Sequence, residues 1–588
     1  MIENQYIMGI KVSQLQKNKG QYFTPLNIVQ SVVKLTLEYV DKQISPFRVL
    51  DPATGEGIFS QEVINLFRPY IDSIHVTALD IDPIVLEEAQ SRLLPLIDSK
   101  NSVDFFHKNF LTETLQNEKK ETFDLIIGNP PHNAKYTEEE WDIIRTMDQG
   151  YISGKIPSES ALFFVLKSLI LLKEGGILSF ILPKPFCYSN RWRSFRKLCL
   201  SNTCLIAVFD LANQFYGQLQ EHVVIILRKS PPQEDFLTGA WNNVYGKVQS
   251  FSRIQTSIAR QADNFLVSIT AEEHKLIEKI YLKCESIEWN AFRGLSSAYR
   301  TQTVGIPLIE KVTITHGFLL PSRSYIEPDT PRKSIKRLLQ PKIICQRIIS
   351  YSTQPIFRLF TPAFIDESGE YITHETVINI NPSLIPGINI YSYGALLQSK
   401  LFTWWLQHVV YTKSFVTSKD LDNPYLKKLL LPKFDQSSDS FNQEFRVSVM
   451  KNLDLMSKDE LIAEVRNQSK IDQFFAIGAL YKLYQKEGTL IKDSLYKMQE
   501  NLSPKSILKL NTDFKRIKRL NFLFTRNRIE EIKNILALSS LVERGIESLV
   551  LQYSKKLEIQ IIIDEIIYLM YDLSMKDQEI ISKGRNYQ

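Results

Sequence analysis

The chain has few cysteines for its 588 residues and no apolar run long enough to cross a membrane. Its five cysteines form no Cys-x-x-Cys pair and make an odd total, which fits neither a disulfide framework nor a zinc cluster. No uncharged apolar run approaches the ~18 residues that a membrane span needs. The 22 glycines and 25 prolines are too few for a collagen-like or low-complexity chain. We therefore expect a globular protein that is not membrane-bound and needs no structural metal.

The N-terminus also lacks an apolar core followed by a small-residue cleavage site, so we expect an intracellular chain. The remaining composition, 44% hydrophobic and 23% charged, is that of an ordinary globular protein. At roughly 100–200 residues per domain, the length leaves room for two to four domains.

Positive charge is concentrated in the C-terminal part of the chain. Residues 1–240 carry 24 Lys+Arg and 28 Asp+Glu, a net of −4, whereas residues 241–588 carry 47 and 37, a net of +10. This asymmetry is typical of a catalytic domain joined to a polyanion-binding domain, although a solvated basic surface would produce it too.

Short β-rich segments alternate with helical stretches through the first 240 residues. The segments are FRVLD (47–51), HVTALDID (75–82), FDLIIGN (123–129), GILSFILP (176–183), LIAVFD (205–210) and HVVIILRK (222–229). This alternation predicts an α/β fold with a largely parallel sheet, whose ligands bind at the carboxyl ends of the strands.

The alternating pattern ends near residue 230. The segment at 229–246 contains two prolines and no clear periodicity, which predicts a linker. We predict a catalytic domain at 1–240, a mixed α+β target-recognition domain at 241–440 and a mainly helical region at 441–588. Trp404 and Trp405 are predicted to be core residues rather than ligand contacts.

A glycine loop follows the first strand, which ends at Asp51. Gly55 and Gly57 allow backbone angles forbidden to other residues, and the next helix offers free N–H groups to a nucleotide-like cofactor. Asp80 ends the next strand, where an acid accepts hydrogen bonds from ribose hydroxyls, with Asp82 as the neighbouring candidate. The spacing D-x-x-x-G-x-G differs from the dinucleotide fingerprint, and glycines and acids form such turns in many α/β proteins.

A second motif, Asn129-Pro130-Pro131-His132, ends a later strand. The prolines lack N–H donors and fix their own φ, so the carbonyl of Pro130 and the amide of Asn129 can be held outward. Methylating an exocyclic amine requires acceptors for its two N–H groups, which these two oxygens supply. His132 can stack on a flipped base or touch its edge. The alternative is that Asn-Pro-Pro merely terminates the strand.

Six segments follow one another in an order shared with a known enzyme class. They are GQYFTP (20–25), DPATGEGIF (51–59), ALDID (78–82), NPPH (129–132), LLKEGGILSFILP (171–183) and NQFYGQLQEHVVIILRK (213–229). With them the sequence resembles the gamma-class N6-adenine DNA methyltransferases of restriction-modification systems, the class that includes the TaqI methyltransferase. The resemblance implies a Rossmann-like methyltransferase domain and an S-adenosylmethionine cofactor.

The resemblance also implies roles for individual residues. Thr24 would bind the methionine carboxylate, Asp51 and Ala53 would line the methionine end, and Asp80 would hold the ribose. Asn109 and Phe110 would contact the cofactor adenine, and Phe215 would stack on the target base. Two positions depart from the class: His132 stands where Tyr or Phe is usual, which weakens stacking, and Asn109 stands where Asp is usual.

The C-terminal half resembles the specificity domains of the same class, through looser motifs. A basic stretch suited to DNA phosphates comprises Arg323, Arg332, Lys333, Lys336 and Arg337, and a second lies at 513–528. Solvated surface is the alternative for both.

The resemblance predicts a site-specific enzyme that methylates N6 of an adenine flipped out of double-stranded DNA. We expect a monomer in the prokaryotic cytoplasm, associated with DNA and possessing a cognate restriction endonuclease as a partner. Only about 20 residues precede the first motif, so no N-terminal nuclease domain is expected. Two alternatives stay open: an RNA or protein amino-methyltransferase, and a non-catalytic DNA-binding subunit.

Overall fold

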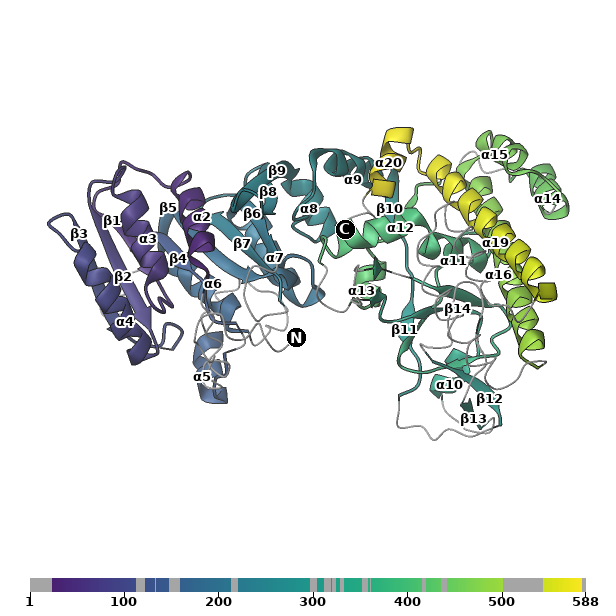
Figure 1. Ribbon diagram of the computed structural model, residues 1–588, viewed down its shortest axis with the longest axis horizontal. Helices are drawn as coiled ribbons and strands as arrows, with labels where there is room; N and C mark the ends of the chain where they lie inside the picture. Colours follow the sequence, from purple (N-terminus) through teal and green to yellow (C-terminus); the bar gives the residue numbers. More distant parts are fainter. Residues whose placement is uncertain are drawn as a thin grey trace. The chain divides into compact units, whose positions relative to one another are not determined.

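The computed structural model divides the chain into two compact units (Figure 1). Unit 1 comprises residues 1–275 and 408–416, and unit 2 comprises residues 276–407 and 417–588. The residues that the structure describes are 24–112, 122–132, 134–146, 159–212, 220–296, 304–310, 319, 324–327, 333–351, 358–359, 361–414, 419–434, 441–453, 455–500 and 543–583.

Unit 1 is built on one nine-stranded sheet with the strand order β3-β2-β1-β4-β5-β7-β6-β8-β9. The strands are β1 (Phe47–Asp51), β2 (Ile74–Asp80), β3 (Asn101–His107), β4 (Phe123–Gly128), β5 (Leu172–Pro183), β6 (Cys204–Ala212), β7 (His222–Arg228), β8 (Asp235–Asn242) and β9 (Lys247–Gln255). The strands β1 to β5 are parallel, and β7 inserts antiparallel between β5 and β6. The carboxyl ends of β1, β2 and β4 therefore share one edge with the amino end of β7.

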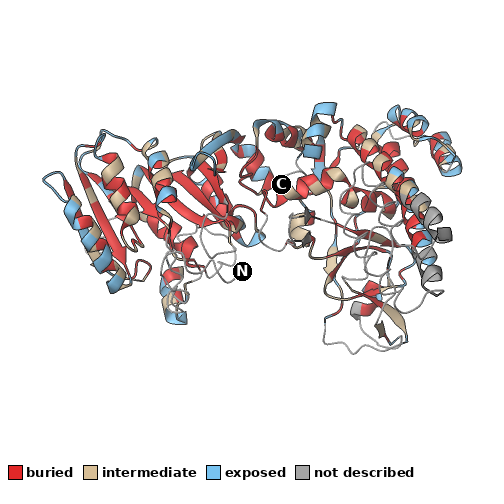
Figure 2. Cartoon of the chain, viewed as in Figure 1, coloured by how far each residue is buried: buried red, intermediate tan, exposed pale blue. Residues whose placement is uncertain are grey.

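Helices cover both faces of this sheet (Figure 1). They are α2 (Leu26–Leu37), α3 (Ile58–Phe67), α4 (Pro83–Leu93), α5 (Glu138–Arg145), α6 (Ser160–Leu171), α7 (Arg193–Ser201) and α8 (Thr256–Ala262), with α9 (Ala271–Lys283) at the boundary of the unit. The helices α2, α3 and α4 share one apolar cluster with alternate residues of the strands, such as Leu125 and Ile127 of β4. Inner strands of the sheet, such as β1, β2, β4, β5 and β7, are buried along most of their length, whereas the edge strands β3 and β9 are largely exposed or half-buried (Figure 2).

Local sequence signals fix where the helices begin. The side chain of Asp82 accepts a hydrogen bond from the Ile84 N–H at 3.1 Å, and Pro83 occupies the first helical position of α4, where its missing N–H costs nothing. Thr137 and Glu140 form a reciprocal capping box at the start of α5.

The segment 408–416 returns to unit 1 from far along the sequence. The amide of Asn264 donates to the carbonyls of Val409 and Val410 at 2.7 and 3.1 Å. Lys413 Nζ lies 2.8 Å from Glu273 Oε2, and both side chains are buried. A buried cation and anion need one another, because either would be costly alone.

Unit 2 combines small sheets with long helices. Its strands are β10 (Cys284–Ser286), β11 (Ala291–Arg293), β12 (Ile306–Ile309), β13 (Tyr325–Ile326), β14 (Lys342–Gln346), β15 (Ser350–Tyr351), β16 (Arg358–Leu359), β17 (Ala363–Asp366), β18 (Ile372–Thr373), β19 (Val377–Ile380) and β20 (Leu430–Pro432). Its helices are α10 (Lys333–Leu338), α11 (Ile390–Gln398), α12 (Lys400–Trp405), α13 (Asn423–Leu426), α14 (Gln443–Asn452), α15 (Lys458–Arg466), α16 (Lys470–Glu500), α19 (Glu543–Met570) and α20 (Met575–Lys583).

The sheet order confirms the predicted Rossmann-like α/β fold, and the described elements after residue 440 are helical, as predicted. Trp404 and Trp405 are buried, as predicted for core residues. The linker predicted at 229–246 is wrong, because β8 lies within it and pairs with both β6 and β9. The two prolines precede this strand, so they interrupt no ladder. The division at residues 240 and 440 stays a prediction. Among the described helices, none combines the length and apolarity that spanning a bilayer demands.

Candidate cofactor and base-binding site

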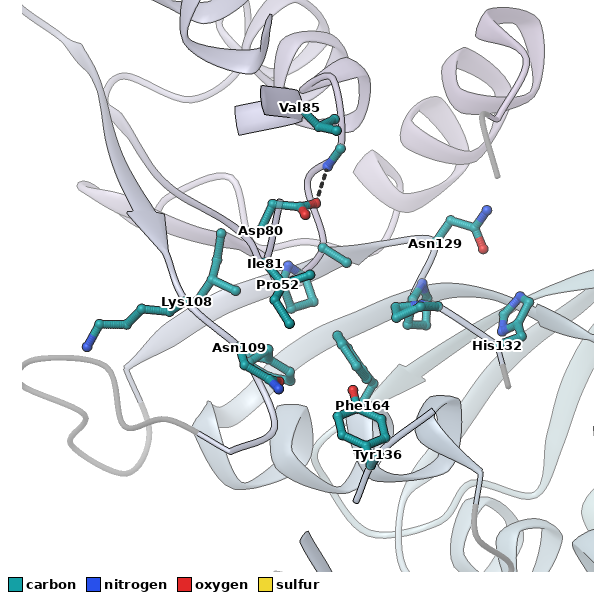
Figure 3. A pocket seen from close by; sticks show the side chains of 16 residues that line it. Pro52, Asp80, Ile81, Val85, Lys108, Asn109, Asn129, His132, Tyr136 and Phe164 are labelled. Atoms are coloured by element: carbon teal, nitrogen blue, oxygen red, sulfur yellow. Dashed lines mark hydrogen bonds between the residues drawn. The ribbon is translucent and has the colours of Figure 1, made fainter. Parts of the chain in front are cut away.

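A recess opens in unit 1 where the strands β1, β2 and β4 end (Figure 3). The space within it, including the solvent at its open mouth, is about 820 Å³. Asp80 and Ile81 lie on one side of it, and Tyr136 and Phe164 lie on another (Figure 3). The residues that line it are Pro52, Ala53, Gly55, Leu79, Asp80, Ile81, Val85, Lys108, Asn109, Phe110, Asn129, Pro130, Pro131, His132, Tyr136 and Phe164.

The glycine loop braces the carboxylate of Asp80. The Gly55 N–H donates to Asp80 Oδ2 at 2.9 Å, and the Asp82 N–H donates to Asp80 Oδ1 at 2.9 Å. Burial raises the pKa of Asp80, while these hydrogen bonds oppose the rise. The carboxylate is thus held in place at the recess, where its remaining lone pairs can accept hydrogen bonds from ribose hydroxyls.

Gly55 and Gly57 both have left-handed backbone angles, with φ values of +54° and +79°. They differ in their surroundings. A Cβ on Gly55 would meet no atom within 4 Å, whereas a Cβ on Gly57 would lie 3.2 Å from both Ala89 Cβ and Leu93 Cδ1 of α4. Gly57 is therefore needed for the packing of α3 against α4, and Gly55 for the lining of the recess.

This difference predicts that two matched substitutions affect stability and cofactor binding to different extents. Gly57→Ala should lower the free energy of unfolding by about 2 kcal/mol, because it adds crowding to a left-handed backbone. Gly55→Ala should cost about 1 kcal/mol from the backbone alone, but should weaken cofactor binding at least tenfold. Chemical unfolding and calorimetric titration with S-adenosylmethionine measure both quantities. A Gly57→Ala protein as stable as Gly55→Ala would contradict the assignment.

Asp51 lies behind the recess and is fully buried. Its Oδ2 accepts hydrogen bonds from the hydroxyls of Thr54 and Ser60, each at 3.0 Å. Its Oδ1 has no hydrogen-bond partner among the residues that the structure describes. Burial raises the pKa of Asp51 to about 7, although the two hydroxyls act in the opposite direction. This buried acceptor is suited to a cationic or hydrogen-donating ligand.

Asn129 follows the end of β4 with its amide group oriented by a neighbour. Its Nδ2 donates to Thr24 Oγ1 at 3.1 Å, which leaves Oδ1 as the free end. That oxygen is buried, and it has no partner within the described part of the chain. The Ser160 hydroxyl donates to the carbonyl of Pro131 at 2.5 Å and so anchors the same turn to α6.

His132 stacks on His222, the first residue of β7. The ring centroids are 5.7 Å apart and the rings are inclined by 30°. His132 is 5% exposed, and neither of its ring nitrogens has a hydrogen-bond partner among the described residues. Burial lowers the pKa of His132 to about 3, with a smaller contribution from His222, so the ring is neutral at pH 7.

An apolar wall completes the recess. Phe110 packs on Phe164 of α6, with ring centroids 4.9 Å apart. Val85, Tyr136 and Phe164 were not predicted from the sequence. Phe164 lies in a helix that is apolar on nearly every side, so no helical stripe distinguishes it from core residues. Tyr136 lies one residue before Thr137, which begins the capping box of α5. This capping pattern marks the start of a helix, but it does not indicate that Tyr136 lines a site.

The structure brings most predicted site residues to this recess. Those that line it are Ala53, Gly55, Asp80, Asn109, Phe110, Asn129, Pro130, Pro131 and His132. Thr24, Asp51 and Gly57 support it from behind through the contacts given above. Asn109 Oδ1 accepts a hydrogen bond from the Leu111 N–H at 3.0 Å, so this oxygen is already engaged locally. The roles of these residues stay predictions.

Other predicted residues fall elsewhere. Lys336 and Arg337 are exposed on α10 of unit 2. Lys333 begins the same helix, but its side chain lies outside the described residues, as do Phe215, Arg323, Arg332 and the segment 513–528.

Comparisons with known proteins cover the part of the chain that contains this recess. Residues 71–216, which include the end of β2 and the Asn-Pro-Pro-His turn, match the family model of the Eco57I restriction-modification methylase. The chain is 31% identical over 229 residues to the Type II methyltransferase M.VspI of Vibrio sp., covering 39% of this chain and 52% of that protein.

Two further relatives are more distant. The Type II methyltransferase M.AccI of Acinetobacter calcoaceticus is 24% identical over 329 residues, which is 55% of either chain. The Type II methyltransferase M.BsuBI of Bacillus subtilis is 28% identical over 303 residues, covering 47% of this chain and 58% of that protein. The chain thus spans about half the length of the curated relatives it matches.

The site has acceptor oxygens and an aromatic face suited to S-adenosylmethionine. Asp80 offers a carboxylate for ribose hydroxyls, and Phe110 with Phe164 forms a face for an adenine ring. Behind the recess, Asp51 has a buried oxygen that meets no partner among the described residues. No comparison tests the likeness to the TaqI enzyme, which stays a prediction. Residues 71–216 are thus similar to the methylase family of restriction-modification systems, and the site is suited to S-adenosylmethionine as its cofactor.

Proposed function

We propose that this protein methylates N6 of an adenine flipped out of duplex DNA at one short sequence, as the modification enzyme of a restriction-modification system. One observation carries the proposal: Asn129 lines the recess with a buried Oδ1 that has no partner among the described residues. A buried acceptor without a partner is costly unless a ligand satisfies it. An exocyclic amine supplies the missing donor.

The protein's contribution to the reaction is positioning. S-adenosylmethionine, when bound, supplies an activated methyl group on a sulfonium. Asn129 Oδ1 and the Pro130 carbonyl accept the two N–H groups of the target amine, which localises the nitrogen lone pair away from the ring. Thr24 holds the Asn129 amide in the orientation that presents its oxygen. No strong general base is needed, because the donor is already activated.

The cofactor would be held by the other residues of the recess. Asp80 accepts hydrogen bonds from the ribose, and Phe110 packs on the cofactor adenine. Asp51 provides an acceptor near the methionine end, and Gly55 lets the main chain approach the ligand closely. Asn109 lines the recess beside Phe110, while its Oδ1 accepts a hydrogen bond from the Leu111 N–H.

DNA would be bound partly by unit 2, whose residues belong to the positively charged part of the sequence. The guanidinium of Arg337 lies 3.9 Å above the ring centroid of Phe292, beside a polar recess that also includes Asn290, Gln340 and Asn381. Arginine and amide side chains are the groups that most often contact DNA phosphates and base edges.

Arg337→Ala should weaken binding to duplex DNA roughly tenfold at about 0.1 M salt, and should lower the dependence of affinity on salt by about one counterion. Arg337→Lys, which keeps the charge, should retain most of the affinity. Fluorescence anisotropy titrations at several salt concentrations measure both effects. Equal affinity and salt dependence in all three proteins would remove Arg337 from the DNA interface.

The experiment that tests the function is expression of the full chain in a host without adenine methylation, followed by mapping of N6-methyladenine at single-base resolution. Methylation at one short sequence is the expected result, and it would also identify the recognition site. The cognate restriction endonuclease would then be sought by cleavage of the unmodified site.

Two other outcomes separate the alternatives. A competition assay with DNA, RNA and protein substrates would reveal an amino-methyltransferase with another target. Tight DNA binding without methyl transfer, in a protein that binds S-adenosylmethionine, would indicate a non-catalytic subunit.

A further inference from the structure

The stacked pair of His132 and His222 follows from the topology of the sheet. Because β7 runs antiparallel to β5, its first residue lies at the edge where β4 ends. This places His222 beside the Asn-Pro-Pro-His turn, although 90 residues separate the two histidines in the sequence. Their ring centroids are 5.7 Å apart.

A buried network holds the start of β7 in place. The Lys184 N–H donates to the Glu221 carbonyl at 2.9 Å, and Lys184 Nζ lies 3.6 Å from Glu221 Oε1. The hydroxyl of Ser414 donates to the other carboxylate oxygen of Glu221. His222, the next residue, is therefore attached to a rigid support, and it fixes one face of the His132 ring.

His132 itself has more hydrogen-bonding capacity than its surroundings use. The ring is neutral, so one nitrogen carries a proton to donate and the other is an acceptor. Both nitrogens are buried, and neither meets a partner among the described residues. Histidine is costly in such a place if its only task is to stack, because a phenyl ring would fill the same space without unsatisfied nitrogens.

The target base offers the missing partner. If Asn129 and Pro130 accept both N–H groups of the adenine amine, the adenine atoms still free on either side are the acceptors N1 and N7. A neutral imidazole lining the same recess has a donor suited to either. This step depends on the function proposed above.

We propose that His132 is a specificity-determining residue that donates a hydrogen bond from its imidazole N–H to N1 or N7 of the flipped adenine, with His222 as the positioning residue that orients it. The aromatic ring at this turn then reads the edge of the base as well as its face. A base with a donor at the corresponding atom is rejected.

The test uses duplexes in which the target adenine is replaced by 7-deazaadenine or 1-deazaadenine, each of which lacks one acceptor but keeps the amine. Steady-state kcat/KM values are measured for the wild-type protein and for His132→Phe. In the wild type, one analogue should lower kcat/KM about tenfold or more relative to adenine. His132→Phe should lower kcat/KM for adenine by a similar factor, and the same analogue should then cause less than a twofold further loss.

His222→Phe is the matched control, since it makes the same ring change in the partner of the stack. Whatever its effect on the rate, it should keep the analogue penalty of the wild type. Thermal unfolding and S-adenosylmethionine binding of each variant show that the domain is intact. Should a variant not fold, His132→Asn, which keeps a donor, replaces His132→Phe and is expected to retain a penalty for the same analogue.

Other results overturn the inference. An analogue penalty that is unchanged in His132→Phe, or no penalty for either analogue in the wild type, would show that His132 only stacks. A wild-type protein that does not methylate adenine in DNA at all would refute the proposed function, and the role of His132 with it. Methylation of the adenine duplex by the wild type distinguishes a failure of the proposed function from a failure of the role of His132 alone.

Discussion

Replacing Asn129 by alanine is expected to lower the rate of methyl transfer by about 10³-fold or more, while the affinity for S-adenosylmethionine changes less than about threefold. The substitution removes the buried oxygen that accepts one N–H of the target amine, so the lone pair stays delocalised in the ring. The substitution removes a hydrogen-bond partner of Thr24 but leaves Asp80, Gly55 and the aromatic wall of the recess in place, which is why most of the cofactor affinity should persist. Single-turnover methylation and calorimetric titration measure the two quantities.

Asn129→Asp provides the comparison for this prediction. It keeps an acceptor oxygen but loses the N–H group that Thr24 orients, so we expect a rate between those of the wild type and Asn129→Ala. Thermal unfolding would verify that all three proteins are folded. If Asn129→Ala turns over at the normal rate, the base-binding role of the turn is refuted.

The second large effect concerns the ionisation of Asp51. Burial raises its pKa to about 7 in the folded protein, well above the value of about 3.9 in an unfolded chain. The folded state therefore binds this proton more tightly than the unfolded state does. The stability from this group is complete below about pH 4, decreases as the pH rises to about 7, and stays low above that.

Asp51→Asn removes this pH dependence. Between pH 5.5 and 8.5 the cofactor-free wild type should lose about 2 kcal/mol from this group, at ~1.4 kcal/mol per pH unit up to its pKa, whereas Asp51→Asn should lose none of it. The difference in unfolding free energy between the two proteins, measured at both pH values, should shift in favour of the variant by that amount. A difference that does not vary with pH would show that Asp51 ionises as an ordinary carboxyl group.

Cofactor binding should respond in the opposite direction. A cationic ligand favours the ionised carboxylate, so the affinity of the wild type for S-adenosylmethionine should increase between pH 6 and 8, with release of protons on binding. Calorimetry in two buffers of different ionisation enthalpy measures that release. Asp51→Asn should bind more weakly and release fewer protons over the same range.

Local sequence signals were enough to locate one side of the site. The glycine loop and the acid at Asp80 follow strands whose apolar character is plain, and parallel strands bring their carboxyl ends together. The Asn-Pro-Pro-His turn was recognised for the same reason, since its prolines end a strand abruptly. The positions of these residues could therefore be predicted from the residues next to them in the sequence.

The remaining parts of the site could not be predicted, because they depend on contacts between segments that are distant in the sequence. Nothing near His222 in the sequence indicates that its ring meets His132, because the antiparallel insertion of β7 decides it. The same holds for Phe164, whose helix is apolar on almost every side. The linker prediction failed at β8 because the two prolines of that segment lie before the strand begins. Turn-forming residues in the sequence also do not reveal which strands pair with β8.

The return of residues 408–416 to unit 1 limits how the gene can be divided. A fragment that ends at residue 275 would contain Glu273 without its lysine partner, and would leave the amide of Asn264 without the two carbonyls that it contacts. Exchange of unit 2 between related chains must therefore keep this nine-residue stretch with unit 1, although it is encoded between two parts of unit 2.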